Sequence, residues 1–404
     1  LGCLFIRFAL ENVFLSFTLV IRDFKKSLFS YFNNNMGSFA NLEIGGRSLF
    51  ESKNSFFYDI VEILFSEQDI EKKIDDVDGY YSFYGFEQRI NNCLDRLGVI
   101  GVNESKAEDA FNKAKSELLQ DGRNKHFDIS YGEYKDAIYQ IVTTDYEGDG
   151  SMGLNLLDDL TNDLLLEGMD LASNLFTILS VFKSEEYIVY DLTAVVNGGW
   201  VTETDVLSSM PEKILVLTEG KTDTEFIKYA LDIRYPHLKD HYQFLDFEQY
   251  NPEANASYLA KFVTSLAAAN FKHPIIAIFD NDTTGISEMV RLKKIRLGER
   301  MRVLKYPDLE IAKNYPALGP SGIQEMDING LACSIELYFG EEILKRNGEF
   351  VPITWKAYND REKKYQGEIQ EKGEVQNRFR DRAREGYHCG DMELILTTIF
   401  KAYH

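Results

Sequence analysis

Lys213–Thr218 (KILVLT) and His273–Phe279 (HPIIAIF) are the stretches that decide the fold of the second half of this chain. Each is a short, continuous apolar run, which is typical of a strand buried on both faces of a parallel sheet. Weaker strand patterns and helical patterns alternate with them: strands at Tyr242–Phe247 and Arg302–Tyr306, and helices at Thr222–Ile233, Ala256–Ala269 and Ile286–Leu297. This alternation indicates βαβ units, so we expect an α/β domain with a doubly wound parallel sheet over residues 211–345.

The composition fits a folded protein of two or three domains. The chain has 404 residues, of which 44% are apolar and 27% charged, and these values exclude disordered, collagen-like and coiled-coil classes. The net charge of −21 argues against a nucleic-acid partner, but it is unevenly divided. Residues 1–205 carry 17 Lys and Arg against 35 Asp and Glu, whereas residues 206–404 carry 27 against 30. The second half is therefore compatible with a phosphate-bearing partner.

Two observations bear on the compartment. The four cysteines are too sparse and too far apart for a disulfide framework or a CxxC pair, which favours a reducing cytoplasm. Leu1–Ile21 is rich in Phe, Leu, Val and Ile, but Arg7 and Glu11 interrupt this stretch and no small-residue cleavage site follows it. Because the chain begins with Leu and Met36 precedes a strand pattern, we expect residues 1–35 to be an upstream extension of the reading frame, with no membrane contact.

Residues 36–207 are expected to form a mainly helical α+β accessory domain. Asn41–Phe50 alternates apolar and polar residues around Gly45-Gly46 and predicts a β-hairpin. Apolar residues at three-to-four spacing predict three helices, through Phe57 to Leu64, Phe86 to Leu97 and Leu156 to Met169. Ile188–Tyr190 and Ala194–Val196 are predicted as strands, and Ser208–Pro211 as a linker.

Acidic residues follow both of the strongest strands in the second half. Glu219 and Asp223 come after KILVLT, and Asp280 and Asp282 come after HPIIAIF. Ligands of such sheets bind outside the carboxyl ends of the strands, so we expect these side chains to converge. Converging carboxylates repel one another unless a cation neutralises them, and Mg²⁺ accepts carboxylate and phosphate oxygens. The pattern predicts a site for Mg²⁺ or Mn²⁺, with two ions, suited to phosphodiester chemistry.

These motifs resemble the Toprim domain of topoisomerases, primases and OLD-family nucleases, over about residues 211–345. Ser334-Ile-Glu336 is similar to the Ser-x-Glu element of OLD-type Toprim nucleases, in which the glutamate joins the metal site. The stretch from Met36 to Gly46 resembles the HEPN/Toprim-associated N-terminal domain, which precedes HEPN or Toprim domains in bacterial proteins. The resemblance implies a metal-dependent nuclease that cuts DNA or RNA, with a role in defence against phage.

The resemblance also implies roles for individual residues. Glu219, Asp280 and Asp282 would be catalytic and would bind metal, with Asp280 as the central ligand. Asp223 and Glu336 would be further metal ligands, Gly220 and Gly285 would let backbone approach the metal and phosphate, and Ser334 would position a ligand or water. OLD-type nucleases also use a lysine from farther down the chain, and six positions are open for it: Lys345, Lys356, Lys363, Lys364, Lys372 and Lys401.

Several of these residues have structural alternatives. Asp223 could be a first-turn acid that interacts with the helix dipole. Asp280 and Asp282 could be turn formers at the end of a strand. Glu336 could lie on the solvent face of a packed segment, because its apolar neighbours could form the buried face of that segment.

Other patterns bear on partners. Gly220-Lys221-Thr222 is not the end of a phosphate-binding loop, because position 215 is Leu where such a loop needs Gly. Any ATP control would therefore come from a separate ATPase or sensor protein. The basic stretch Arg291–Lys305 could follow a phosphate backbone or could be a solvated helix face. Lys356–Arg384 is predicted as an exposed helix within a helical C-terminal segment, residues 346–404, that acts as a lid or a homo-oligomer contact.

Two alternative functions remain open. One is a non-cleaving Toprim protein that binds nucleic acid and regulates. The other is a primase-like nucleotidyltransferase, against which the lack of a zinc-binding cysteine cluster counts.

Overall fold

The structure is a computed structural model that describes residues 37–75, 79–120, 125–144, 156–157, 160, 164–245 and 255–404. The prediction for residues 1–35 lies outside these residues. The chain divides into two compact units, one ending at Met210 and one that comprises Pro211–His404 with residues 66–68 and 98–101. Within the described ranges, no helix combines the length and the apolar character needed to cross a lipid bilayer.

The first unit is built on a five-stranded antiparallel sheet in the order β2-β1-β5-β4-β3. Its strands are β1 (Phe39–Ile44), β2 (Arg47–Lys53), β3 (Ile70–Ile74), β4 (Tyr81–Arg89) and β5 (Tyr187–Asp191). Its helices are α2 (Tyr58–Leu64), α3 (Ile90–Val99), α4 (Glu104–Gln120), α5 (Tyr131–Thr143), α7 (Leu171–Leu179), α8 (Thr193–Asn197) and α9 (Glu203–Ser208). Alternate strand residues such as Leu42 and Tyr190 are fully buried in one apolar cluster with α2 and α3, while α4 and α5 share a second cluster.

Three predictions for this unit are wrong in part. Phe86 belongs to β4, where Tyr84 and Phe86 alternate onto the buried face, and the helix begins only at Ile90. Ala194–Val196 forms α8 instead of a strand, and of these three residues only Val195 is buried. Part of the helix predicted through Leu156–Met169 lies outside the described residues. Its last residues form turns, because the Asn174 side chain bonds to the backbone of Leu166 and Met169.

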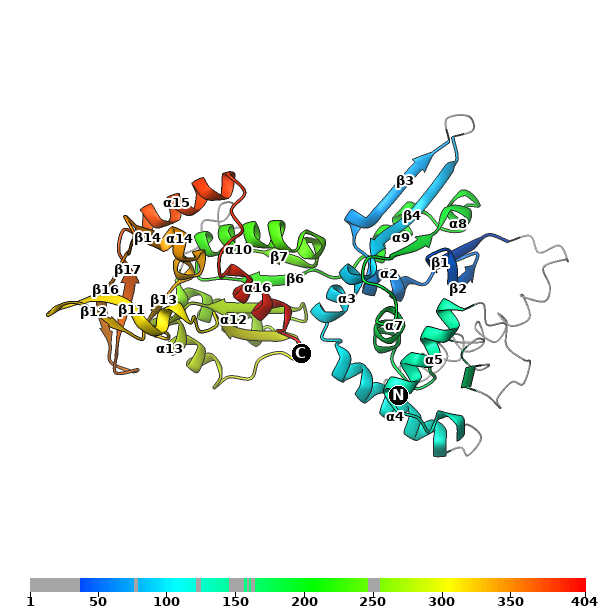
Figure 1. Ribbon diagram of the computed structural model, residues 1–404, viewed down its shortest axis with the longest axis horizontal. Helices are drawn as coiled ribbons and strands as arrows, with labels where there is room; N and C mark the ends of the chain where they lie inside the picture. Colours follow the sequence, from blue (N-terminus) through cyan, green and yellow to red (C-terminus); the bar gives the residue numbers. More distant parts are fainter. Residues whose placement is uncertain are drawn as a thin grey trace. The chain divides into compact units, whose positions relative to one another are not determined.

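The second unit contains a parallel sheet with helices on both faces, which makes it an α/β fold. The strands β6 (Ile214–Leu217), β7 (Tyr242–Phe244), β8 (Ile275–Phe279) and β10 (Met301–Lys305) pair in the order β10-β8-β6-β7, all parallel. Ile276 and Ile278 of β8 pack in one apolar cluster with α10 (Lys221–Arg234) and α16 (Met392–Phe400). Ile275 and Phe279 pack in another with α12 (Ala256–Ala268) and α13 (Thr283–Leu292), and Figure 1 shows α10 and α12 on opposite faces of the sheet.

These elements agree closely with the predicted ones. Every strand predicted for the sheet is present, and the helices α10 and α12 differ from prediction by about one residue at each end. The third predicted helix, Ile286–Leu297, instead begins at Thr283 and ends at Leu292. It begins earlier because the Asp282 carboxylate caps its first turn by accepting a hydrogen bond from the Gly285 amide.

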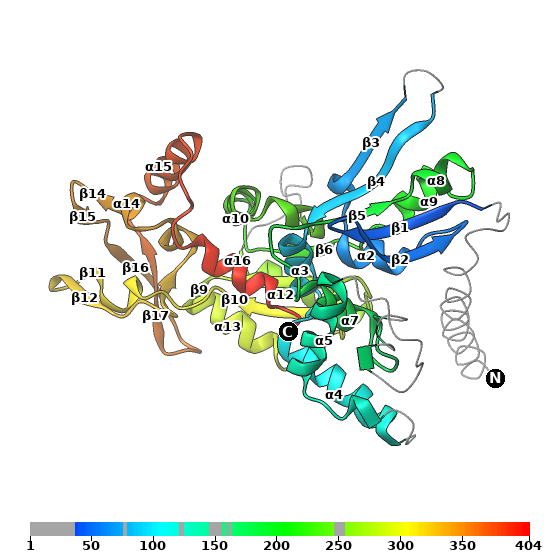
Figure 2. The same cartoon turned by 45° about the vertical axis from the view of Figure 1, so that its right-hand side comes forward.

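The rest of this unit is less helical than predicted. Strands β11 (Tyr315–Gly319), β12 (Gly322–Met326), β16 (Ile353–Asn359) and β17 (Lys364–Ile369) form a second sheet in the order β12-β11-β16-β17 (Figure 2). Shorter elements are β9 (Asn281–Asp282), β13 (Ala332–Cys333), β14 (Lys345–Arg346), β15 (Glu349–Phe350), α14 (Glu341–Leu344) and the 3-10 helix η5 (Ile335–Phe339). The exposed helix predicted over Lys356–Arg384 is therefore wrong in its first half. Aromatic and β-branched residues there favour the β16–β17 hairpin, and only α15 (Lys372–Arg384) is helical.

Candidate functional site

The acidic residues of the second unit gather where the strand order of the parallel sheet reverses. The chain moves from β6 outward to β7 and then returns to β8 on the other side of β6, so the carboxyl ends of β6 and β8 are adjacent. Glu219 follows β6 and Asp280 follows β8 directly. The backbone amide of Asp280 donates a hydrogen bond of 2.9 Å to Glu219 Oε1. Such a reversal point is where open α/β sheets bind their ligands.

Asp223 and Asp282 lie in the same cluster, and both are buried. Asp223 stands in the first turn of α10, and its Oδ1 accepts a hydrogen bond of 2.9 Å from the Tyr306 hydroxyl. Asp282 Oδ1 accepts from the Gly285 amide at 2.7 Å, and its Oδ2 accepts from Gln366 Nε2 at 2.5 Å. Asp223 is thus more than a first-turn acid, because the hydroxyl of a fully buried tyrosine from another segment binds it.

Glu336 is the most deeply buried acid of the cluster, with no exposed surface. Its Oε2 accepts a hydrogen bond of 2.6 Å from Ser334 Oγ, and its Oε1 accepts one of 2.6 Å from Gln376 Nε2. The Lys372 ammonium lies 3.4 Å from Oε1. The alternative that placed Glu336 on a solvent face is wrong, because the apolar residues of η5 are buried all round it. Ser334 positions this carboxylate through its hydroxyl.

Gly285 allows the first turn of α13 to approach the ends of both strands. A Cβ atom added at this position would lie 2.5 Å from the carbonyl oxygen of Asp280 and 3.0 Å from Glu219 Oε1. Contacts that short are not sustained by real side chains, so only glycine permits this packing. Gly220 precedes the first residue of α10 and has an extended backbone.

Burial and mutual repulsion raise the pKa values of the clustered carboxyl groups. The pKa of Asp223 is raised to about 6, first by burial and then by the charge of Glu336. Burial, and then the neighbouring carboxylates, raise the pKa of Glu219 and of Asp280 well above the ordinary range. Burial also raises the pKa of Asp282, although the hydrogen bond from the Gly285 amide opposes the shift. The cluster therefore holds more negative charge than its surroundings stabilise.

Lys372 is the one of the six candidate lysines that the structure places beside the cluster. It begins α15, and its ammonium is close to Glu336 and to Glu368, at 3.4 and 3.9 Å. Burial alone would lower its pKa, but the charges of Glu336, Asp280 and Asp223 outweigh burial and raise it. The sequence offered no spacing rule that singled it out, because it lies 36 positions after Glu336 and a hairpin lies between them.

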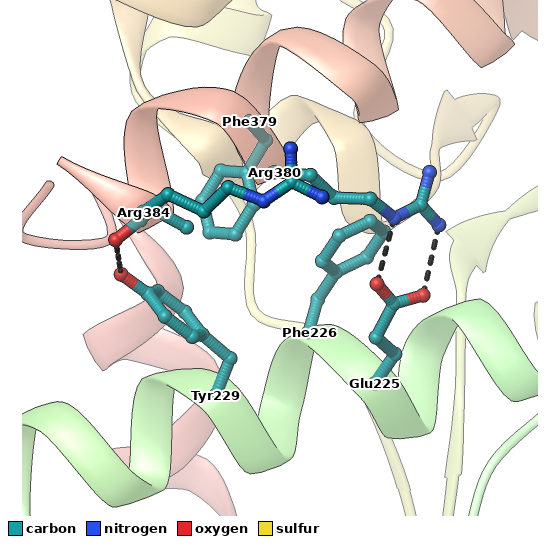
Figure 3. Close-up of a pocket in the computed structure, with 7 residues that line it drawn as sticks. Glu225, Phe226, Tyr229, Phe379, Arg380 and Arg384 are labelled. Carbon is teal, nitrogen blue, oxygen red and sulfur yellow. Dashed lines mark hydrogen bonds and ion pairs between the residues drawn. The ribbon is translucent and has the colours of Figure 1, made fainter. Parts of the chain in front are cut away.

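The helix that carries Lys372 is fastened to the helix that carries Asp223. Arg380 of α15 makes a two-pronged ion pair with Glu225 of α10, with nitrogen–oxygen distances of 2.7 and 2.8 Å. The Tyr229 hydroxyl donates to the carbonyl oxygen of Ala383 at 2.9 Å. These contacts border a pocket of about 280 Å³ between the two helices, and Figure 3 shows the side chains that line it. The charged groups that line the pocket are paired with Glu225, Arg380 or Asp381, and the contacts beside it hold α15 against α10.

Two observations test whether the acidic cluster suits a cation. Asp280 Oδ1 is out of contact with solvent and has no hydrogen-bond partner in the described structure. The neighbouring acidic side chains would offer a cation carboxylate oxygens as ligands. Hard divalent cations prefer such oxygens, so the residues fit a group of that kind. Against this, no three His, Cys, Asp or Glu side chains of the described ranges are placed to hold one metal ion together. The other carboxylates are held instead by protein donors and by Lys372.

A family comparison bears on the first unit. Residues 36–213 match the family model of HEPN/Toprim N-terminal domain 1. The match supports the resemblance that the residues after Met36 carry. No curated protein and no solved structure matches the chain. The acidic cluster lies after the residues that match HEPN/Toprim N-terminal domain 1, so the match does not bear on it. The interpretation of the cluster therefore rests on its own geometry.

Some cations of the basic stretch Arg291–Lys305 form ion pairs with acidic residues that the structure describes, and others do not. Arg291, Arg300 and Lys305 form ion pairs with Glu288, Glu212 and Asp308. Lys293, Lys294 and Arg296 are exposed just after α13. Arg302 donates a hydrogen bond to the Ala402 carbonyl oxygen. Among the residues that the structure describes, three of the seven cations of the stretch thus remain available to a phosphate backbone, fewer than the sequence alone indicated.

Proposed function

We propose that this protein is a metal-dependent nuclease of the Toprim type that hydrolyses phosphodiester bonds in DNA or RNA. The proposal includes a Toprim-type doubly wound domain over residues 211–345, behind an N-terminal accessory domain over residues 36–207. The observation that carries it is the gathering of Glu219, Asp223, Asp280 and Asp282 at the reversal point of a parallel sheet, where Asp280 Oδ1 has no hydrogen-bond partner among the described residues. A cluster that raises its own pKa values in this way is costly to fold, and such clusters are characteristic of functional sites.

Each side chain has a role in this proposal. Glu219, Asp223, Asp280, Asp282 and Glu336 would hold Mg²⁺ or Mn²⁺. When bound, these ions would polarise the phosphate and lower the pKa of attacking water. Neighbouring groups orient these carboxylates by donating hydrogen bonds to them. Gln366 and the Gly285 backbone amide orient Asp282, Tyr306 orients Asp223, and Ser334 and Gln376 orient Glu336.

Lys372 supplies the positive charge that the chain itself contributes. Its raised pKa keeps the ammonium protonated at neutral pH. A protonated lysine at this place can stabilise negative charge that develops on the phosphate during cleavage. We therefore propose Lys372 as the lysine that OLD-type nucleases take from farther down the chain.

A cleavage assay tests the proposal. Purified full-length protein is incubated with plasmid DNA and with total RNA in Mg²⁺, Mn²⁺ or EDTA. We expect metal-dependent cleavage of at least one substrate, lost in Asp280→Asn and in Lys372→Met. Lys345→Met is the matched control, because Lys345 pairs with Glu341 away from the cluster and its loss should leave cleavage unchanged. Cleavage in EDTA, or full cleavage by Asp280→Asn, would refute the proposal.

A second candidate function is a protein that binds nucleic acid without cutting it. The observation that favours it is that protein donors and Lys372 already engage most of the clustered carboxylates, while no three described acids are placed around one metal position. Under this alternative, Mg²⁺ leaves both the melting temperature and nucleic-acid binding unchanged. Under the nuclease proposal, Mg²⁺ raises the melting temperature.

A further inference from the structure

The β16–β17 hairpin presents exposed aromatic rings on one of its faces. Tyr358 lies directly opposite Tyr365 in the antiparallel register, and the two ring centroids are 5.0 Å apart. The two side chains are 46% and 57% exposed. Trp355 pairs with Gly367, two residues from Tyr365, so its ring lies on the same face, 6.2 Å from the Tyr365 ring. The hairpin thus carries three neighbouring rings, of which the two tyrosines are open to solvent.

The hairpin is joined directly to the acidic cluster. Gln366 follows Tyr365, and its amide donates to Asp282 Oδ2 at 2.5 Å and accepts from the Thr284 backbone at 2.9 Å. The Thr283 hydroxyl donates to the carbonyl oxygen of Tyr365 at 2.8 Å. Strand β17 also contacts α13, the helix that begins at the cluster. The strand that carries Tyr365 is therefore fixed to the cluster through the Gln366 side chain and the Tyr365 carbonyl oxygen.

Basic side chains surround the turn of the hairpin. Arg361, Lys363 and Lys364 are exposed, and none of them forms an ion pair with any residue that the structure describes. Asp360 and Glu362 in the same turn offset two of these three charges. The turn is still net positive, in a chain whose net charge is −21. A polyanion with flat apolar faces is complementary to this combination of cations and rings.

We propose that the β16–β17 hairpin binds single-stranded nucleic acid, with unpaired bases stacking on Tyr358 and Tyr365. The phosphates would contact Arg361, Lys363 and Lys364, and the strand would continue to the acidic cluster. Unpaired bases are required because base faces in a duplex are covered by their neighbours, whereas aromatic platforms bind exposed faces of any sequence. This inference rests on the proposed nuclease function and assigns it a substrate class, single strands or unpaired segments.

Binding in EDTA tests this inference without any need for cleavage. Fluorescence anisotropy compares full-length protein on a labelled DNA single strand, an RNA single strand of the same sequence and the DNA duplex. We expect a single strand to bind more tightly than the duplex. Comparison of the DNA and RNA single strands shows whether the protein prefers deoxyribose or ribose. Tyr358→Ala and Tyr365→Ala should each weaken single-strand binding about fivefold or more, while the phenylalanine variants should stay within about twofold of wild type. The combined Lys363→Ala, Lys364→Ala variant should flatten the salt dependence of binding.

Tyr139→Ala is the matched control, because Tyr139 is a 52% exposed tyrosine on α5 of the first unit. It should leave binding unchanged. Tighter binding to the duplex, equal loss with Tyr139→Ala, or no loss in either hairpin variant overturns the inference. So does a wild-type dimer that becomes monomeric in Tyr365→Ala with binding unchanged, because the rings would then form a contact between copies of the chain.

The same preparations separate this inference from the nuclease proposal. Metal-dependent cleavage with duplex preference and no effect of the tyrosine variants supports the nuclease and overturns the role of the hairpin. Tyrosine-dependent binding of single strands without cleavage in Mg²⁺ or Mn²⁺ supports the hairpin and overturns the nuclease.

Discussion

Among the residues of the cluster, Asp280 shows most clearly that a carboxylate proposed for catalysis can lower the stability of the folded protein. Within the part of the chain that the structure describes, one oxygen of its carboxylate has no hydrogen-bond partner, and burial and three neighbouring acids raise its pKa. Replacing it with the neutral Asn removes this repulsion. We expect Asp280→Asn to raise the free energy of unfolding of the metal-free protein by about 1 kcal/mol and to abolish cleavage. Chemical denaturation in EDTA measures the first effect.

The control for this prediction is Asp232→Asn, which removes an exposed carboxylate from α10 of the same unit. This variant should change neither stability nor cleavage. A metal-free Asp280→Asn protein that is less stable than wild type would show that the carboxylate has a structural role instead.

Asp223 makes the stability of the metal-free protein depend on pH. Its folded pKa of about 6 lies above the value of an unfolded aspartate, so the folded state binds this proton more tightly. The resulting stabilisation is complete below about pH 4 and is lost as the pH rises through about 6, by on the order of 3 kcal/mol. In EDTA, the difference in unfolding free energy between wild type and Asp223→Asn should change with this sign from pH 4 to pH 7. A difference that is constant with pH would contradict the assignment.

The residues of the site were predictable to the extent that they follow strand ends. Glu219, Asp280 and Asp282 could be located from the buried apolar runs before them, because a strand end fixes where the next side chains lie. Lys372 and Gln376 could not be located, because they reach Glu336 through a fold of the chain that no local spacing encodes. Gln366 was missed for the same reason, and its segment was assigned to the wrong type of element.

At the scale of elements, the packing of α13 against the ends of β6 and β8 depends on Gly285. Gly285→Ala would place a methyl group against the Asp280 carbonyl and the Glu219 carboxylate, and overpacking of this kind costs about 1–3 kcal/mol. We expect reduced stability in thermal unfolding and loss of cleavage, because Glu219 must move. Gly373→Ala is the matched control: a Cβ at this helical position meets nothing within 4 Å. It should be neutral or slightly stabilising. Equal effects of the two substitutions would contradict this account.

Sequence patterns predicted the buried elements better than the exposed ones. The strands β6 and β8 have no polar face, so their apolar runs leave one interpretation once their length is considered. The β16–β17 hairpin has charged residues between its aromatic ones, and the same residues are compatible with an exposed helix. Its pairing with β11 decides the outcome, since Ala317 and Leu318 pair with Ile353 and Thr354. Long-range pairing of this kind is not visible in a local window.

At the scale of the whole molecule, the two units have separate apolar cores and separate sources of stability. The first unit contains a buried ion pair, in which Arg96 Nη1 lies 2.5 Å from Asp69 Oδ2 and also donates to the Leu64 carbonyl. The second unit contains the acidic cluster. A substitution or a ligand that acts on one of these features should therefore act on one core and leave the other unchanged.

We expect calorimetry of the full chain to resolve two unfolding transitions, and Mg²⁺ to raise only the transition of the second unit. Arg96→Met assigns the other transition, because it leaves the Asp69 carboxylate buried without its cation and should cost about 3–5 kcal/mol in the first unit. Asp280→Asn should abolish the Mg²⁺ shift without moving the transition that Arg96→Met lowers. A single transition that responds to both substitutions would contradict independent cores, whereas a Mg²⁺ shift of the Arg96-dependent transition would place the cation site outside the acidic cluster.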